Sequence, residues 1–304
     1  MSEALQVIDP HIHLWDLWTG LYPHFETPRR TRFGSNAAIA RSYLLQEFLD
    51  EGQGEVDVLG AVHVEAFPID TVKETETLQK VADRSPIPIV VVGNADLTSS
   101  EFPTLLERHA AFPSFRGIRQ VLSRHSDPEL TFASRDLMGE PAFLDGLRLL
   151  GKRGFSFDLQ LYPHQMDVAA RLAGEAPDTQ FILDHAGMWT DFDLAGWKTW
   201  KAGMRKLAAR PNIAVKISGL SMRVPIWSLE SIRPIVFETL EAFGVGRSMF
   251  ASNFPVDKLK SDYPALWRAF AAAVAGCSED ERAALFRDNA RRLYRIPFNS
   301  GDRR

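Results

Sequence analysis

The 304-residue chain contains one cysteine, Cys277, which excludes a disulfide framework and any zinc site built from several cysteines. It has no run of about 18 consecutive apolar residues, so no segment is predicted to span a membrane. Lys and Arg number 35 and Asp and Glu number 39, and the net charge of −4 favours neither nucleic acid nor an anionic membrane as a partner. The first ten residues lack the basic and apolar regions of a signal peptide, and we expect a cytoplasmic protein.

Several short motifs are missing as well. No predicted strand is followed by G-x-G-x-x-G or G-x-x-x-x-G-K-[ST], the phosphate-binding sequences of many open α/β sheets. Neither Ser218 nor Ser252 lies in G-x-S-x-G, which argues against a serine-nucleophile hydrolase. Hydrophobic residues make up 45% of the chain and charged residues 24%, the balance of a folded globular protein. Because no linker rich in Pro, Gly or Ser divides the chain, we expect one domain over residues 1–304.

Short apolar segments typical of β-strands alternate with amphipathic helical patterns along the whole chain. The predicted strands are 5–15, 58–67, 87–97, 115–122, 154–163, 180–188, 212–220 and 248–257. The predicted helices are 70–84, 141–152, 165–176, 194–209, 228–243, 263–275 and 278–294. The last helix opens with Ser278 and Glu281 at the spacing of a capping box. Eight such units predict a single (β/α)8 barrel, with an open doubly wound sheet as the rival.

Alternation along each strand predicts which side chains face the barrel interior. If the apolar residues face the helices, the interior of the barrel collects histidines, carboxylates, amides and two cations. On this assignment Val62 and Val64 face outward, and the interior set is Asp9, His11, His13, His63, Glu65, Arg119, Asp158, Gln160, Tyr162, Lys216 and Ser218. Buried polar groups are costly unless they pair or bind a ligand, so this set predicts a binding or catalytic site at the carboxyl ends of the strands.

His11 and His13, two residues apart at the end of the first strand, are the sharpest single feature. Five segments, residues 8–15, 116–119, 184–187, 215–220 and 252–255, together resemble the amidohydrolase superfamily. They are most similar to its amidohydrolase-2 branch of sugar-lactone and pyrone-dicarboxylate lactonases. The resemblance implies a distorted (β/α)8 barrel that hydrolyses a cyclic ester of a sugar acid or a dicarboxylic acid. It also implies an aspartate at the end of strand eight, where this chain has Asn253.

We therefore expect catalysis to involve His11, His13, His185 and Asn253. Substrate contacts are expected from Glu65, Arg119, Gln160, Tyr162, Lys216 and His63. Arg119 suits a bidentate grip on a carboxylate, or else a structural ion pair with Glu65 or Asp158. Lys216 either polarises a carbonyl or pairs with a buried acid. The general base stays open among His185, His13, His63 and Asp257.

Because an amide is a poor ligand for a divalent cation, Asn253 favours a site without a cofactor. Zinc or manganese held by His11, His13 and His185 is the competing expectation. The same residues are compatible with a metal-dependent amidohydrolase or decarboxylase, with a metal-free lactone isomerase, and with a barrel that binds a ligand without catalysis. The expected partner is a small-molecule substrate, with neither nucleic acid nor a membrane involved. A homo-oligomer stays open.

Overall fold

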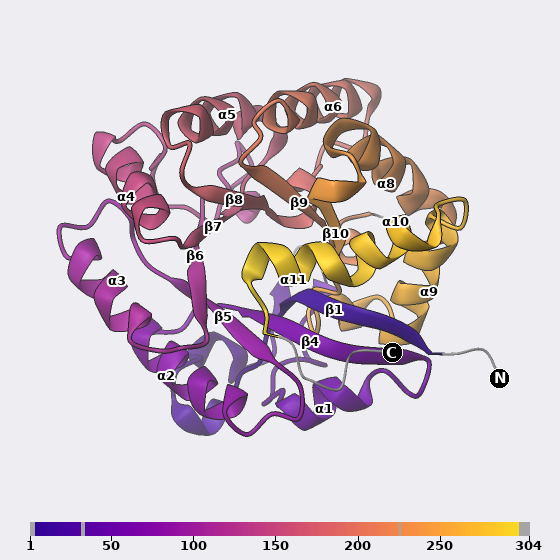
Figure 1. Cartoon of the computed structure of the whole chain (residues 1–304), viewed down its shortest axis with the longest axis horizontal. Coiled ribbons are helices and arrows are strands. Elements are labelled where there is room, and N and C mark those ends of the chain that lie inside the picture. The colour runs from indigo at the N-terminus through magenta and orange to yellow at the C-terminus, as the bar shows by residue number, and fades with distance from the viewer. Residues whose placement is uncertain (1–3, 32–33, 225, 298–304) are drawn as a thin grey trace.

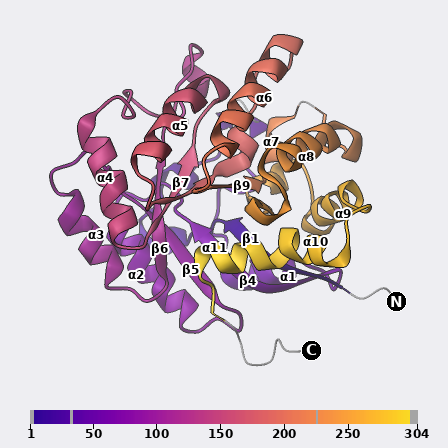
Figure 2. The same ribbon diagram turned by 45° about the horizontal axis from the view of Figure 1, so that its top comes forward.

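Eight parallel strands form a nearly closed barrel surrounded by helices (Figures 1 and 2). The computed structural model describes residues 4–31, 34–224 and 226–297. The barrel strands, in sheet order, are β1 (Leu5–Ile12), β4 (Val56–Val64), β5 (Ile89–Asn94), β6 (Phe115–Val121), β7 (Ser156–Gln160), β8 (Gln180–Leu183), β9 (Ile213–Ile217) and β10 (Ser248–Phe250). A separate antiparallel pair consists of β2 (Arg30–Thr31) and β3 (Gly34–Ser35). The sequence-based prediction of a (β/α)8 barrel is confirmed.

Backbone hydrogen bonds join the first and last strands of the barrel near their carboxyl ends. The Asn253 backbone N–H donates to the His11 carbonyl at 2.9 Å, and the His13 N–H donates to the Phe254 carbonyl at 2.8 Å. Every predicted strand is present, and each is shorter than expected.

Helices follow the strands and form the outer layer in Figures 1 and 2. They are α1 (Leu45–Asp50), α2 (Thr71–Ala82), α3 (Phe102–Ala110), α4 (Pro141–Lys152), α5 (Met166–Glu175), α6 (Leu194–Ala208), α7 (Leu220–Arg223), α8 (Leu229–Phe243), α9 (Tyr263–Ala273), α10 (Glu279–Ala283) and α11 (Asn289–Tyr294). The predicted capping box is present, because Ser278 and Glu281 exchange side-chain and backbone hydrogen bonds at the start of α10. A π-helical stretch, Ala284–Asp288, connects α10 to α11.

The end of the barrel nearest the viewer in Figure 1 is covered by α11, which lies across it. One buried cluster joins strand residues to residues of this segment: Ile8, Val62, Val64, Val90, Val92, Ile182, Ala214 and Met249 with Ala290, Leu293, Tyr294 and Ile296. The Asn289 side chain donates to the carbonyl of Ser248, the first residue of β10. The amino-terminal end of the barrel is therefore filled with apolar side chains.

Two of the predicted strand faces are wrong. Val62 and Val64 point into the interior, because both belong to the cluster that contains Ile182 and Met249 from the far side of the barrel. On β1, Asp9 points outward and accepts a hydrogen bond from Tyr263 of α9 at 3.0 Å. The pairing of β1 with β4 shifts register between Asp9 and Ile12, because Pro10 has no N–H to donate to the neighbouring strand.

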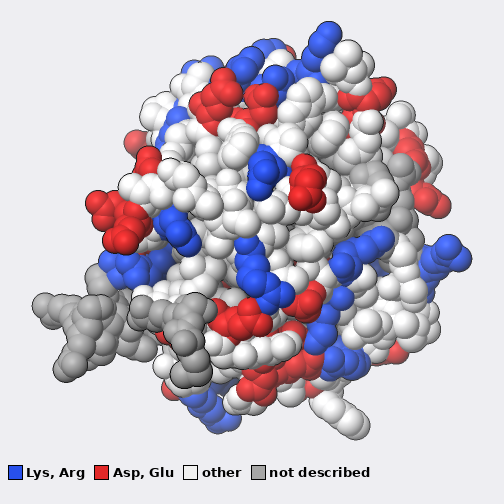
Figure 3. All heavy atoms as spheres, turned by 90° about the vertical axis from the view of Figure 1, so that its right-hand side faces the viewer, with Lys and Arg blue, Asp and Glu red and all other residues white. Residues whose placement is uncertain are grey.

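The surface carries both signs of charge. On the face in Figure 3, Lys and Arg residues are interspersed with Asp and Glu residues, in agreement with the near balance in the composition. Within the described part of the chain, no helix combines the length and the apolar composition that crossing a membrane requires.

Candidate active site

A network of buried charges lies in the barrel interior beyond the apolar layer. Lys216 on β9 places Nζ 2.5 Å from Asp158 Oδ2 on β7 and 3.0 Å from Asp184 Oδ1, just after β8. The same ammonium lies 3.2 Å from His11 Nδ1, and Tyr294 of α11 donates to Asp158 Oδ2 at 2.7 Å. One cation thus faces two carboxylates, and a helix from the end of the chain completes the network.

Burial and the ammonium group set the protonation of this network. Burial, with Lys216 nearby, holds the pKa of His11 well below its usual value, so the imidazole is neutral near pH 7. Burial alone raises the pKa of Asp184, but Lys216 and His11 outweigh it and hold that pKa well below its usual value. Burial raises the pKa of Asp158 to about 6. Asp184 is therefore the carboxyl that stays ionised most firmly.

A second ion pair lies beside the first. The Arg119 Nε atom on β6 donates to Glu65 Oε1 at 2.7 Å, and its Nη2 donates to the Glu65 carbonyl at 2.6 Å. Its Nη1 lies 3.2 Å from Gln160 Oε1. The guanidinium is thus already engaged by protein groups on three of its nitrogens, and Glu65 balances its charge.

A cavity of about 170 Å³ opens at the carboxyl ends of the strands. Its polar lining includes His13, Arg119, Gln160, His185 and Asn253. An apolar wall faces these groups and consists of Trp15, Phe25, Ile39, Ala66, Phe67, Phe132, Met188, Met222, Val256 and Leu259. The Trp15 and Phe25 rings stack at 3.9 Å between centroids, and both come from the long segment after β1. The cavity suits a small ring with one apolar and one polar side.

Two of the histidines that line the cavity, His13 and His185, are oriented by hydrogen bonds at their Nδ1 atoms. His13 Nδ1 lies 2.7 Å from the Val64 carbonyl, which only accepts, so this nitrogen carries the proton. Burial and the Arg119 charge hold the pKa of His13 well below its usual value, which leaves a neutral ring with Nε2 as an acceptor. His185 Nδ1 lies 2.9 Å from Ser218 Oγ.

Strained backbone turns place His185 and Asn253 in the cavity. His185 has φ 55° and Asn253 has φ 59°, a region that residues other than glycine seldom adopt. Gly219, also at positive φ, follows Ser218, and a Cβ at this position would lie 2.7 Å from His185 Nδ1. Glycine is therefore required here so that the histidine and the serine can approach each other.

Asn253 has a buried acidic neighbour. Its Nδ2 donates to Asp257 Oδ1 at 3.2 Å, and the Asp257 backbone N–H donates back to the Asn253 carbonyl at 3.1 Å. Burial raises the pKa of Asp257 to about 7. Asp257 is wholly buried and is absent from the cavity lining, which it contacts through the Asn253 side chain and the Met222 backbone.

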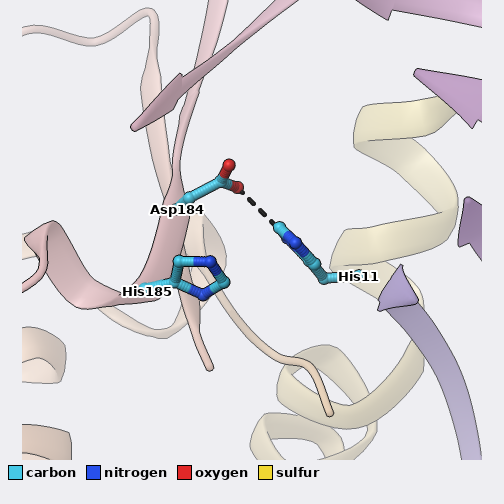
Figure 4. Close-up of side chains that lie close together, drawn as sticks. All are labelled: His11, Asp184 and His185. Atoms are coloured by element: carbon cyan, nitrogen blue, oxygen red, sulfur yellow. Dashed lines mark ion pairs between the residues drawn. The ribbon is translucent and has the colours of Figure 1, made fainter. Parts of the chain in front are cut away.

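Three side chains bring potential metal-ligating atoms together. His11, Asp184 and His185 each offer one atom within 4.8 Å of the others, and Figure 4 shows them converging from the ends of β1 and β8. His11 Nε2 is buried and has no hydrogen-bond partner among the described residues. This donor set can hold a divalent cation. Of the three histidines expected as ligands, His11 and His185 belong to this group, whereas His13 does not.

Eight of the ten predicted site residues lie at the cavity or directly behind it. His13, His185, Asn253, Arg119 and Gln160 line the cavity. Glu65, His11 and Lys216 are wholly buried behind that lining and contact it or one another.

The remaining two predicted contacts point elsewhere. The Tyr162 hydroxyl donates to the Leu130 carbonyl, so this hydrogen bond fixes the segment after β6. His63 faces the helix layer, where its Nε2 lies 3.5 Å from Glu74 of α2.

Sequence reasoning overlooked Asp184. Simple alternation places it on the opposite face from His185. Asp184 lies two residues after Ile182, which faces the interior, and the left-handed turn at His185 and Ala186 brings the His185 side chain to the interior as well. The adjacent Asp-His pair at a strand end is the signal that marks this position.

Comparison with known proteins gives a consistent result. A family model described as "Amidohydrolase" matches residues 8–296. The chain is 43% identical over 300 residues to the uncharacterized protein y4mH of Sinorhizobium fredii, covering 97% of this chain and all of that one. It is 29% identical to an L-fucono-1,5-lactonase of Burkholderia ambifaria, covering 97% of each. A crystal structure of an amidohydrolase from Burkholderia multivorans with bound Zn superimposes with a TM-score of 0.80 at 27% identity, covering 97% of this chain and 100% of that one.

Proposed function

Because this chain belongs to the amidohydrolase family, we propose that it hydrolyses the lactone of a sugar acid by attack of water on the ring carbonyl. The observation that carries the proposal is that His13, His185 and Asn253 belong to the polar lining of a cavity that suits a small ring. The full-length similarity to a protein named L-fucono-1,5-lactonase supports a sugar-acid lactone as the substrate.

The proton transfers follow from the two histidine orientations. His13 Nε2 accepts a proton as the water oxygen bonds to the carbonyl carbon. His185 Nδ1 lies against the Ser218 hydroxyl, and we assign that hydroxyl as the donor. In this tautomer His185 carries its proton on Nε2 and donates a hydrogen bond to the developing oxyanion. The bond between the carbonyl carbon and the ring oxygen then breaks, and the ring oxygen takes the proton from His13. The product is the open hydroxy acid.

The state of Arg119 favours a neutral, hydroxylated lactone over one that carries carboxylates. Glu65 balances the guanidinium charge and occupies two of its nitrogens. The remaining cation of the cavity lining is Arg29, which is exposed to solvent. Gln160 and Asn253 supply amides that suit hydroxyl groups.

A divalent cation also fits the site, because His11, Asp184 and His185 converge there and the buried His11 Nε2 has no hydrogen-bond partner among the described residues. These three residues would hold the ion. Such an ion supplies Lewis-acid polarisation of a carbonyl and lowers the pKa of bound water. The solved relative with bound Zn supports this assignment.

The test is a panel of sugar-acid 1,5-lactones, with ring opening followed by acid release above the spontaneous rate. We expect His13→Ala and His185→Ala each to lower kcat by at least about 100-fold, the scale of a lost acid–base group. His109→Gln is the control, because His109 is buried against Thr75 in the helix layer. Near-normal turnover in both cavity variants, or a wild-type protein that opens no lactone, overturns the proposal.

A further inference from the structure

We propose that Asp257 is a positioning residue, which turns the Asn253 amide so that its oxygen accepts a hydrogen bond from the attacking water. This inference rests on the proposed lactone hydrolysis. It assigns a role to a buried carboxyl that the proton transfers above do not use. Asp257 begins the 3-10 turn Asp257–Leu259, just beyond the cavity residues that follow β10.

The placement of Asp257 is specific. Its carboxyl accepts from Asn253 Nδ2, and its backbone N–H donates to the Asn253 carbonyl, so the side chain and the main chain of one residue are held by the other. Burying a carboxyl is costly unless something compensates for it. No Lys, Arg or His forms an ion pair with Asp257 among the described residues, so charge pairing does not account for its burial. The hydrogen bond from Asn253 offsets this cost most, followed by the hydrogen bonds from the Ser221 side chain and from the Met222 and Ser221 backbones.

An amide has a donor end and an acceptor end that can exchange places by rotation of the side chain. With Nδ2 held by Asp257, the oxygen is the end left for other partners. Asn253 lines the cavity, so that oxygen is available to a water molecule beside the lactone carbonyl. Burial raises the pKa of Asp257 to about 7, yet the protonated and the ionised carboxyl each keep an acceptor oxygen, so the orientation survives in both states.

The same contact explains why asparagine suits position 253. An aspartate here would put a second carboxyl within hydrogen-bond distance of Asp257, and two carboxylates that close cannot both ionise. Asn253 and Asp257 are therefore a complementary pair, with the acidic group placed four residues further along the chain.

The experiment compares Asp257→Leu, which removes the acceptor, with Asp257→Asn, which keeps an acceptor oxygen. With a sugar-acid 1,5-lactone as substrate, we expect Asp257→Leu to lower kcat by about tenfold or more and to change KM by less than about threefold. Asp257→Asn should keep kcat within about threefold of wild type, because its carbonyl oxygen still accepts from Nδ2. Asn289→Ala is the matched control, since it removes a buried amide at the opposite end of the barrel and should leave kcat unchanged.

A second measurement covers the case in which Asp257→Leu does not fold. In protein labelled with ¹⁵N-asparagine, the Asn253 side-chain amide signal, assigned with Asn253→Ala, should shift between about pH 6 and 8 in wild type and stay fixed in Asp257→Asn. An Asn253 signal that ignores pH in wild type overturns the contact.

The remaining outcomes separate the two proposals. An active wild type whose Asp257→Leu variant has normal kcat overturns this inference and leaves the proposed function standing. A loss of about 100-fold or more in Asp257→Asn would mean that Asp257 itself transfers a proton, and it overturns the positioning role. A wild type that opens no lactone overturns the proposed function and this inference with it.

Discussion

The Lys216 ammonium lies 2.5 Å from Asp158 Oδ2 in the barrel interior, and neither side chain has any exposed surface. Lys206 and Asp167 form a pair of the same length on the outside of the molecule, where more than half of each side chain is exposed. The two pairs have the same chemistry and differ in burial. Removing the cation from each pair therefore shows how much more the buried pair contributes to the free energy of unfolding than the exposed one.

We expect Lys216→Met to lower the free energy of unfolding by about 3–5 kcal/mol, because it leaves two carboxyls buried without their cation. Lys206→Met should lower it by less than about 1 kcal/mol, since water solvates the exposed partner. Urea unfolding at neutral pH measures both. Similar losses in the two variants would show that the interior network adds nothing beyond a surface pair.

Asp257 should make stability depend on pH. Burial raises its pKa from the ordinary value of 3.8 to about 7, so between these values the folded protein holds a proton that the unfolded chain has lost. The stabilising contribution is complete below about pH 4 and falls by up to about 1.4 kcal/mol per pH unit as the pH rises to about 7.

Asp257→Asn does not titrate, so its stability relative to wild type should rise from pH 5 to pH 7 and then level off. Asp9 and Asp158, whose pKa values burial raises to about 6, are present in both proteins and cancel in the difference. Urea unfolding across this range supplies the comparison. A constant difference would contradict the raised pKa.

Lys216 should also weaken metal binding. Its ammonium lies 3.0 Å from Asp184, one of the three residues that would hold a divalent cation, so the two positive charges compete for one carboxylate. We expect Lys216→Met to bind zinc about tenfold or more tightly than wild type, and His11→Ala to bind it more weakly. Calorimetric titration with zinc, with His109→Gln as the control, measures both changes. Unchanged affinity in Lys216→Met would exclude the competition.

Glu65 should set the charge preference of the cavity. Glu65→Gln leaves the Arg119 charge unbalanced beside the substrate, which favours a carboxylate. We compare kcat/KM for a lactone that carries two carboxylates with kcat/KM for a neutral sugar lactone. We expect the ratio of the first value to the second to be about tenfold or more higher in Glu65→Gln than in wild type. Wild type should prefer the neutral lactone. An unchanged ratio would mean that Arg119 does not face the substrate's charged group.

Much of the fold could be predicted because strands and helices differ in period and length. The helix predicted over residues 141–152 matches α4 at both ends. The faces of β4 could not be predicted by the same means. In a parallel barrel both faces of a strand are buried, and α11 supplies apolar contacts on the inside, so apolar residues do not mark the outer face.

The candidate site was predicted best where strands stay regular. On β7 and β9, Gln160 and Lys216 point inward as alternation requires, with Gln160 reaching the cavity and Lys216 the charge network. On β1, Ile8 faces the interior and Asp9 faces outward, and the irregularity at Pro10 then lets His11 face inward. After β8, Asp184 follows Ile182 to the interior by alternation, and a left-handed turn brings in His185 as well. Period-two alternation carries no information about such local departures from strand geometry.

The hydrogen bond from Tyr294 to Asp158 has a consequence for biosynthesis. A ribosome makes all eight barrel strands before it reaches α11, so the emerging barrel holds an incomplete charge network and an open amino-terminal end. Cotranslational folding normally proceeds from the N-terminus. Here the interior is completed only once α11, which follows all eight strands, has been made and packs against the amino-terminal ends of those strands.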